Sequence, residues 1–488
     1  MLDRLVPTAI VAAVVATLFT HTKGYGLLGF DSYPIIVTSR VRSLADLVGN
    51  FTEKLMDGRY PSDFYRPLLN LSFSLDHALW GLNPFGYQLT NALLLAVAGG
   101  ALWMLLRRLL GRETWIGTLT GLLVFLLSPV HWEVLPVPAR RGELLCVAFM
   151  AIALTLQLAP RALASRRPPV WPAVATLLAI ASKETAFVLP VLVCVAVLIR
   201  SERETFRGRL VHAAISSIPH VAAAGLMLVV RLLILGGLGG HGAYSLKGIL
   251  LTWRAVQHLL LPQPMMQRSF AYGLLIMLAA ALAIALGVGL TRASDKSRRR
   301  GAPCLKVSAL AATWVVLLGL IYAVGHLDAW YSLIPLAGWA LLAGALMEGL
   351  LVLGEDDDGI VRTVAIASLV MLTVAVVWQS SHSPAFREYD EWTRATSASD
   401  TYLEETRRLI TNAADGTIVE SPPLPYSVRV HGVQRLWGVA ILADYSVQAW
   451  ADLVFPDRNV RVHRAQEAPQ APGPDEIVLR IPGYWYVD

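Results

Sequence analysis

Long apolar runs recur along almost the whole chain, and they limit its fold more than any other feature. Of the 488 residues, 55% are hydrophobic and only 16% are charged, and the mean hydropathy is +0.54. These values lie far outside the usual range of soluble globular proteins. A helix needs about 20 apolar residues to cross the hydrocarbon core of a bilayer. The sequence therefore predicts a mainly α protein that crosses a membrane many times.

About eleven apolar runs are long enough, or nearly long enough, to span a membrane. No small-residue cleavage site follows the first run before Lys23, so we interpret that run as an uncleaved span. The segment 253–266 is interpreted as interfacial or re-entrant. The expected spans cover about 5–22, 87–106, 115–127, 144–158, 170–181, 185–199, 211–235, 270–290, 307–324, 332–353 and 361–378.

Basic residues between the apolar runs set the expected orientation. Cytoplasmic loops carry an excess of Lys and Arg, and eleven spans with a cytoplasmic N-terminus place every main basic group on that side. The net charge of +6 therefore reflects membrane topology, and nucleic acid is not an expected partner. The three cysteines have no metal-ligand spacing and predict no disulfide framework. The basic groups are Arg4 and the segments 107–112, 161–167, 200–209 and 292–306.

The chain is expected to divide into a membrane domain, 1–379, and a soluble extracytoplasmic C-terminal domain, 380–488. The membrane domain contains a long first extracytoplasmic loop, about 24–86. Within this loop, 44–55 and 68–79 have the amphipathic spacing of helices that lie at a membrane interface.

The C-terminal segment has the pattern of a small α/β domain. A helix is expected near 387–412, because apolar residues recur there at helical spacing among alternating charges. Short β-type runs follow at 417–419, 433–441 and 477–479. The segment has no tetratricopeptide-like period.

Polar residues among the apolar runs, on the predicted extracytoplasmic face, are the candidates for function because charge at membrane depth is costly. Asp31 follows the first span and could remove a proton from an acceptor hydroxyl, or simply cap a helix. Lys183 beside Glu184 must be satisfied internally or bind a ligand such as a lipid phosphate. Arg66 could bind phosphate through its planar guanidinium, or reach toward lipid headgroups.

Further polar residues could line the same cavity. His131 and Glu133 are two apart and suit a structural hydrogen-bonded pair or two metal ligands. Arg140, Arg141 and Glu143 begin a span on the face where basic residues are disfavoured, which indicates either anion binding or a structural role. His326, Asp328 and Tyr331 precede the tenth span and could equally form a plain rim.

Together these residues predict a polar cavity open to the outer leaflet, with cations for a phosphate and carboxylates for acid–base chemistry. Such a cavity fits the transfer of a sugar from a polyprenyl phosphate. The chain has no Gly-rich phosphate loop, which disfavours a nucleotide-sugar donor. It also lacks the repeat symmetry between halves that is common in transporters.

Several short motifs occur in a fixed order between about residues 25 and 345. They are Asp31, Tyr65-Arg66-Pro67-Leu68, Asn83 to Asn91, Pro129-Val130-His131-Trp132-Glu133, Arg141-Gly142-Glu143-Leu144-Leu145, Ser182-Lys183-Glu184 and Asp328-Ala329-Trp330-Tyr331. This ordered set resembles the GT-C membrane glycosyltransferases. The similarity is greatest to the protein O-mannosyltransferase-like group, which includes the transmembrane and tetratricopeptide-containing mannosyltransferases.

The resemblance implies that a hexose such as mannose moves, with inversion, from a polyprenyl-phosphate donor to a hydroxyl on the extracytoplasmic side. The general base would then be Asp31, and the donor phosphate would lie against Arg66, Arg141 or Lys183. The supporting residues would be His131, Glu133, Glu143 and Glu184. The family often has a second acid where this chain has Ser32, and a histidine where it has Ser128. A divalent cation therefore stays open as a cofactor, and so does the acceptor, which could be a protein, a glycan or a lipid.

Two other functions stay open at this point. A transporter or flippase for a lipid-linked sugar would share the cavity, and a scaffold without catalysis would bind partners through its tail. The Arg- and Ala-rich composition favours a bacterial inner membrane as the location.

Overall fold

The computed structural model describes most of the chain and divides it into two compact units, each of which is described by itself. The first unit comprises Met1–Thr17, Leu93–Glu133 and Gly142–Ser383, and the second comprises Leu18–Ala92, Val134–Arg141 and Pro384–Asp488. The described residues are 2–111, 114–128, 130–165, 169–201, 205–240, 295–324, 329–353, 363, 366–367, 384–414, 416–421, 427–429, 438–464 and 478–480.

The chain is mainly helical, as the sequence predicts, and the described ranges hold 6 helical segments that are long and apolar enough to cross a membrane. These segments coincide with six of the expected spans. They are Leu5–Thr22, Pro84–Leu110, Trp115–Val134, Phe206–Leu235, Gly301–Tyr322 and Trp330–Val352.

Three further expected spans are helices that are shorter than a full membrane crossing. They are α8 (Arg141–Gln157), α10 (Val170–Ser182) and α11 (Leu189–Arg200), with 17, 13 and 12 residues. At 1.5 Å per residue a helix of this length falls short of the bilayer core. The spans expected at 270–290 and 361–378, and the segment 253–266, lie outside the described residues. The count of eleven therefore stays a prediction.

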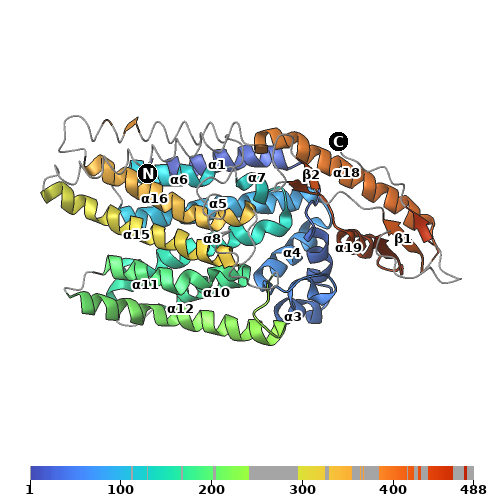
Figure 1. The fold of residues 1–488 in the computed structure, drawn as a ribbon, viewed down its shortest axis with the longest axis horizontal. Coiled ribbons are helices and arrows are strands. Elements are labelled where there is room, and N and C mark those ends of the chain that lie inside the picture. The colour runs from blue at the N-terminus through green and yellow to red at the C-terminus, as the bar shows by residue number, and fades with distance from the viewer. Residues whose placement is uncertain are drawn as a thin grey trace. The chain divides into compact units, whose positions relative to one another are not determined.

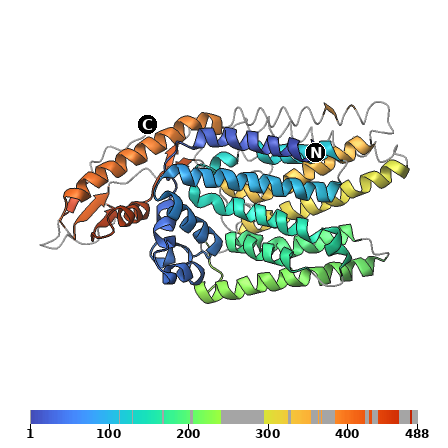
Figure 2. The same cartoon turned by 180° about the vertical axis from the view of Figure 1, so that it is seen from behind.

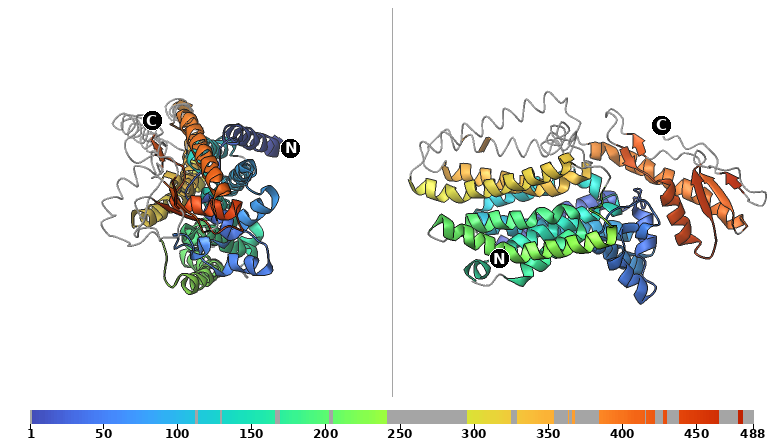
Figure 3. Two further views of the ribbon diagram at one scale, coloured as in Figure 1. Left: turned by 90° about the vertical axis from the view of Figure 1, so that its right-hand side faces the viewer. Right: turned by 60° about the horizontal axis from the view of Figure 1, so that its bottom comes forward.

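The helices of the first unit pack in two groups. In the first group α15 (Asp295–Val324) and α16 (Leu333–Leu353) form a hairpin, and α6 (Trp115–Leu126) packs against α16 (Figure 1). In the second group α10 and α11 lie beside α12 (Phe206–Leu235) (Figure 3). Glycines allow α6 and α16 to approach closely, since a Cβ on Gly117 would lie 2.5 Å from the carbonyl oxygen of Gly344. Small residues at such contacts are typical of helices that associate in membranes.

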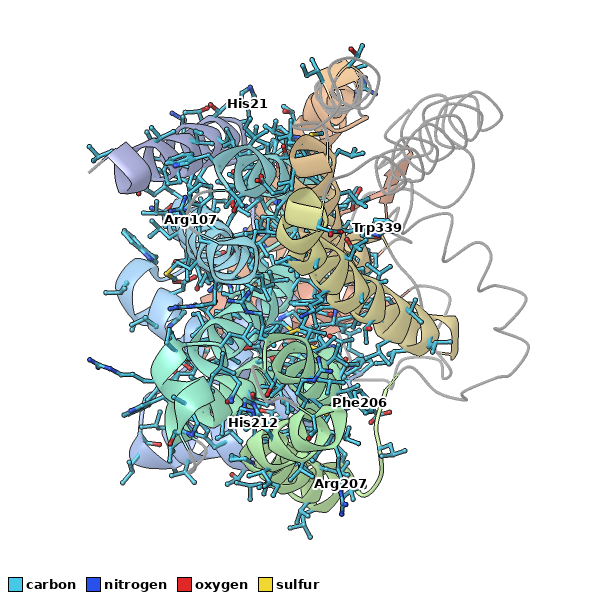
Figure 4. The ribbon with its side chains drawn as sticks, turned by 90° about the vertical axis from the view of Figure 1, so that its left-hand side faces the viewer. His21, Arg107, Phe206, Arg207, His212 and Trp339 are labelled. Atoms are coloured by element: carbon cyan, nitrogen blue, oxygen red, sulfur yellow. The ribbon has the colours of Figure 1, made fainter. Side chains whose placement is uncertain are left out.

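Basic residues gather at one end of the first unit's helices. Arg107 lies in the last turn of α5 (Pro84–Leu110), and Arg207 lies in the first turn of α12; both are seen at the end that faces the viewer in Figure 4. The positive-inside rule places both residues on the cytoplasmic side. The helix packing therefore agrees with the expected topology within this unit, although the direction of insertion stays a prediction.

The second unit contains the first loop, whose two amphipathic segments are helices as expected. The first is α3 (Leu44–Thr52), which begins with a capping box between Ser43 and Asp46. The second is α4 (Pro67–Trp80), which has proline at its start, where a missing N–H costs nothing, and ends at Gly81 with φ 59. The short helix α2 (Ser32–Ser39) precedes them and packs on α4. Their location at a membrane interface stays a prediction.

The C-terminal part also belongs to the second unit and has α18 (Pro384–Asn412), α19 (Asp444–Val454) and five short strands. Figure 2 shows α18 lying alongside β1 and α19. One sheet has the order β4-β1-β5 with parallel pairs, and β2 pairs antiparallel with β3. The strands are β1 (Ile418–Ser421), β2 (Ser427–Arg429), β3 (Gly438–Ala440), β4 (Arg461–Arg464) and β5 (Val478–Arg480).

A single hydrophobic cluster joins this C-terminal part to the first loop. Trp392 and Trp450 pack in the same cluster as Tyr25, Leu28 and Ile36. At about 25 cal/mol per Å² of buried apolar surface, aromatic side chains contribute strongly to such a core. The helix expected at 387–412 is present, and β1, β3 and β5 each overlap one of the β-type runs expected at 417–419, 433–441 and 477–479. No helix was expected at the position of α19. The independence of 380–488 as a separate domain stays a prediction.

Candidate functional site

Asp31 is partly exposed to solvent and stands at the N-terminal end of α2, but its side chain does not cap that helix. Instead, Oδ1 accepts a hydrogen bond of 3.0 Å from the hydroxyl of Tyr445, which lies in the first turn of α19. The helix-capping alternative for Asp31 is therefore wrong. Its carboxylate instead contacts the C-terminal part at the place where the first loop begins.

Two arginines lie close enough to Asp31 to influence its charge. Burial raises the pKa of the Asp31 carboxyl above its usual range, and the Tyr445 hydrogen bond, Arg66 and Arg140 act in the opposite direction. Arg66 is the residue before α4, and its guanidinium lies over the ring of Phe64, 4.3 Å from the ring centre. Arg140 ends the short 3-10 helix η2 (Pro138–Arg140). This arrangement brings a carboxylate with raised proton affinity near two cations.

The turn that carries Asp31 is held by one short stretch of the C-terminal part. Gly29 donates its backbone N–H to the carbonyl of Ile441 at 3.0 Å, and the Ser446 hydroxyl bonds to the carbonyl of Phe30. Gly29 has φ 91, and a Cβ there would lie 2.4 Å from Val137 Cγ1. Glycine is needed because this backbone conformation and this close approach both exclude a side chain.

Arg141, the first residue of α8, is completely buried and bound to an acid that the sequence analysis did not single out. Its Nη1 lies 2.6 Å from Oδ2 of Asp76 in α4. Its Nε donates to Asn91 Oδ1 at 3.0 Å, and the guanidinium lies over the ring of Phe73, 4.4 Å from its centre. Thr90 donates to the other oxygen of Asp76 at 2.7 Å. The guanidinium is thus engaged on several sides within the protein.

Lys183 and Glu143 form a buried ion pair in the first unit. Each side chain is only 3% exposed, and the Lys183 ammonium also lies 4.0 Å from the ring centre of Tyr331. Tyr331 belongs to the 3-10 helix η4 (Ala329–Ser332) and stacks on Tyr322 with ring centres 5.6 Å apart. Glu143 Oε2 receives no hydrogen bond from any residue in the described ranges. The sequence predicts that Lys183 is satisfied internally or binds a ligand, and this ion pair, which joins α8 to the residue after α10, supplies an internal partner.

His131 makes a structural contact. It lies in α7 (His131–Val134), and its Nε2 is 2.7 Å from the backbone carbonyl of Phe125. Glu133 is nearly buried in the same short helix, and Glu184 begins the 3-10 helix η3 (Glu184–Val188). Among the residues that the structure describes, no group of three or more His, Cys, Asp or Glu could hold a metal ion.

The expected site residues divide between the two units. Asp31, Arg66 and Arg141 lie in the second unit, and His131, Glu133, Glu143, Lys183, Glu184 and Tyr331 lie in the first. Asp328 and His326 lie outside the described residues. Within one unit the structure brings together Asp31 with Arg66, and within the other Glu143 with Lys183 and Tyr331. Convergence on one cavity stays a prediction.

Buried polar residues that the sequence analysis missed have a common signal. His220 in α12 contacts Thr176 Oγ1 at 2.6 Å through Nδ1 and Gln157 Oε1 at 3.1 Å through Nε2. Asp76 is the one acid in α4. Both stand inside apolar runs, where a polar side chain requires a partner. Tyr445 offered no such signal, because tyrosine is common in any core.

No protein-family model matches the chain. The chain is 38% identical over 90 residues to the protein O-mannosyl-transferase TMTC2 of Mus musculus, which is 18% of this chain and 10% of that protein. It is 31% identical over 146 residues to the protein O-mannosyl-transferase Tmtc1 of Drosophila melanogaster, 28% of this chain and 16% of that protein. The matches thus span less than a fifth of these relatives' length.

Two solved structures are also similar. Both are of ArnT from Cupriavidus metallidurans, one in the apo state and one bound to undecaprenyl phosphate, with TM-scores of 0.44 and 0.47 and identities of 14% and 15%. Each alignment covers 94% of this chain and 89% of ArnT. The partial sequence matches to the TMTC proteins confirm what the motifs indicated: this chain resembles the O-mannosyltransferase-like group of GT-C membrane glycosyltransferases.

Proposed function

We propose that the chain is an integral-membrane glycosyltransferase that moves a hexose, such as mannose, from a polyprenyl-phosphate donor to an acceptor hydroxyl. The observation that carries this proposal is the state of Asp31. Its carboxylate is not used as a helix cap, has a raised pKa and lies near two arginines. The TMTC proteins that the chain resembles are named as O-mannosyltransferases.

The reaction places two demands on the protein, and both have candidate residues. Asp31 takes the proton from the acceptor hydroxyl as its oxygen attacks the anomeric carbon from the face opposite the phosphate. The bond from that carbon to the phosphate oxygen breaks, and the polyprenyl phosphate leaves with the bonding electrons. A raised pKa suits a general base, because proton transfer is most efficient when the pKa approaches the working pH.

The leaving phosphate requires a cation, and Arg66 is the better candidate of the two arginines first considered. Arg141 is fully buried and bound to Asp76 and Asn91, so it would have to break an ion pair to reach a ligand. Arg66 is half-buried and near Asp31. An arginine can hold two phosphate oxygens at once through its planar guanidinium. Lys183 is the second candidate cation for a phosphate.

The decisive test uses Asp31→Asn, which keeps the size of the side chain and removes its basicity. Purified protein is supplied with radiolabelled polyprenyl-phosphate-mannose and membranes that provide acceptors. We expect transfer to fall by at least about 10²-fold, the usual range for loss of a general base, while binding of the lipid donor persists. Asp63→Asn is the matched control, because Asp63 is exposed and its ion pair with Lys54 is 3.6 Å long.

The same variant separates the alternatives. A flippase moves the lipid-linked sugar across liposomes without needing a base, so Asp31→Asn would leave that movement intact. A scaffold would transfer no sugar in either form. Full transfer by Asp31→Asn would remove Asp31 from the mechanism.

A further inference from the structure

The C-terminal part contributes one side chain directly to the candidate base. The Tyr445 hydroxyl donates a hydrogen bond of 3.0 Å to Asp31 Oδ1, and the two residues lie 414 positions apart in the sequence. A hydroxyl that donates to one carboxylate oxygen orients the carboxylate and lowers the basicity of that oxygen. It therefore favours the other oxygen as the one that receives a proton from an acceptor.

The position of Tyr445 is fixed by its neighbours. The Ser446 hydroxyl accepts from the backbone N–H of Ala443 at 3.0 Å, which caps the first turn of α19, and it also bonds to the carbonyl of Phe30. Ile441 accepts the N–H of Gly29. Three contacts from residues 441–446 thus hold residues 29–31. These contacts hold the backbone of the α19 start against the turn that carries Asp31.

We propose that Tyr445 is a positioning residue for Asp31: its hydroxyl holds Oδ1 and leaves Oδ2 to take the proton of the acceptor. This inference rests on the proposed function of Asp31 as the base. It gives the C-terminal part a role in the reaction, since α19 supplies the group that orients the carboxylate. Precise orientation matters because small displacements of a reacting group can lower rates by up to about 10²-fold.

The charges around Asp31 determine what loss of this hydroxyl would do. The groups that face it are Arg66 from the segment before α4, Arg140 from η2 and Tyr445 from α19. All three favour the ionised carboxylate, while burial disfavours it. Removal of the Tyr445 hydroxyl therefore shifts protonation of Asp31 to higher pH and leaves the carboxylate free to rotate.

The test compares Tyr445→Phe with Tyr60→Phe. Tyr60 also donates to a carboxylate, Asp452 Oδ2, at 2.9 Å, so each variant loses one phenolic hydrogen bond between the first loop and α19. The first readout is labelling of Asp31 by a hydrophobic carbodiimide, which reacts with protonated carboxyls, followed across pH by mass spectrometry of the peptide. Asp31→Asn defines the background. The second readout is the pH profile of sugar transfer.

We expect Tyr445→Phe to raise the pH midpoint of Asp31 labelling by about one unit, the usual scale for one hydrogen bond to a charged group. Transfer should fall about tenfold in kcat with little change in the acceptor KM. Tyr60→Phe should change neither readout. A common melting temperature for the two variants would separate these effects from loss of folding.

Two results would overturn the inference. An unchanged labelling midpoint in Tyr445→Phe would mean that the hydroxyl does not bind Asp31. Faster transfer by Tyr445→Phe would mean that the hydroxyl occupies the place of the acceptor. If instead the wild type transfers no sugar but the labelling midpoint still shifts, the proposed function fails while the contact between the two residues stands.

Discussion

Arg141 and Asp76 form an ion pair that is closed to solvent: the two charged groups are 2.6 Å apart, and their side chains are 0% and 2% exposed. An arginine in such a place is held by its partner, by Asn91 and by the rings of Phe73 and Tyr87. The pair joins the start of α8 to α4 within the second unit. The pair therefore links these two helices.

Asp76→Asn should destabilise the protein by about 3–5 kcal/mol, because it leaves the Arg141 charge buried without a counter-charge. The asparagine amide still offers an oxygen that accepts the hydrogen bond from Thr90. The loss of stability therefore measures the effect of removing the Asp76 charge. Thermal unfolding of the detergent-solubilised protein measures it. Asp63→Asn, in an exposed ion pair with Lys54, should leave the melting temperature unchanged. Equal melting temperatures for Asp76→Asn and Asp63→Asn would contradict the claim that the Arg141–Asp76 ion pair is buried.

Asp31 should set the acidic limb of the pH profile of sugar transfer. The base must be ionised, so the rate falls as the pH drops through the pKa of Asp31. Burial raises that pKa, and the limb should therefore lie above the usual range of a carboxylic acid. Measurement of kcat/KM across pH checks this. A limb at the ordinary carboxylic acid pKa would assign the base to a more exposed group.

The same shift predicts a gain of stability in Asp31→Asn. A carboxyl whose pKa is raised by folding stabilises the protein fully only below its unfolded pKa, and this contribution is lost as the pH rises through the folded pKa. Above its folded pKa, the ionised Asp31 is therefore a cost that asparagine removes. We expect a higher melting temperature for Asp31→Asn on the alkaline side of the profile, with the difference disappearing in acid. A variant that melts lower than wild type at every pH would contradict this sign.

Much of the helical framework follows from the sequence because the membrane imposes a minimum helix length. The six long spans overlap the predicted ones, although three of them, Trp115–Val134, Phe206–Leu235 and Gly301–Tyr322, extend further at one end than predicted. The runs that form α10 and α11 were predicted as short because Lys183 and Glu184 interrupt the apolar sequence. Helix ends were harder: Glu184–Val188 forms a 3-10 helix, and α11 begins only at Leu189. Hydropathy does not distinguish one kind of helical turn from another.

The sequence indicates candidate residues for the site, but it does not indicate which of them pair. Asp31, Arg66 and Lys183 were identified because charge beside or within an apolar run needs a reason. Their partners depend on tertiary packing: Glu143 comes from another helix, and Tyr445 comes from the other end of the chain. Arg141, for which anion binding and a structural role were both open, is paired with Asp76 from α4. A single sequence contains no signal for such distant pairs.

A double-mutant cycle can separate a structural role of Lys183 from a role in binding. Lys183→Met leaves Glu143 buried without its partner and should cost about 3–5 kcal/mol. Adding Glu143→Gln removes the orphaned charge and should recover most of that loss. If Lys183 also binds the donor phosphate, affinity for a polyprenyl phosphate stays low in the double variant although stability returns. Recovery of both stability and affinity would make the pair structural only.

Glycines in α6 should be required for its packing on α16. A Cβ at Gly121 would lie 2.6 Å from the carbonyl oxygen of Ala340, so Gly121→Ala must push two backbones apart. Overpacking of this kind costs about 1–3 kcal/mol. Gly100→Ala in α5 is the control, because nothing lies within 4 Å of its Cβ position; there alanine should stabilise the helix slightly. If Gly121→Ala has the same melting temperature as Gly100→Ala, α6 and α16 are farther apart than the structure shows.

The predicted topology places Asp31 and Lys183 on one face of the membrane and the basic helix ends on the other. Single cysteines at Arg107 and Arg207, which lie at one end of the first unit (Figure 4), should react with a membrane-impermeant maleimide only after permeabilisation. A cysteine at Asp63, in the exposed part of the first loop, should react in intact cells. The single cysteines are introduced into a variant in which Cys146, Cys194 and Cys304 have been replaced, because these free cysteines could also react. Labelling of both positions from the same side would invalidate a shared extracytoplasmic cavity, because Lys183, one span away from Arg207, would then lie on the side opposite the first loop.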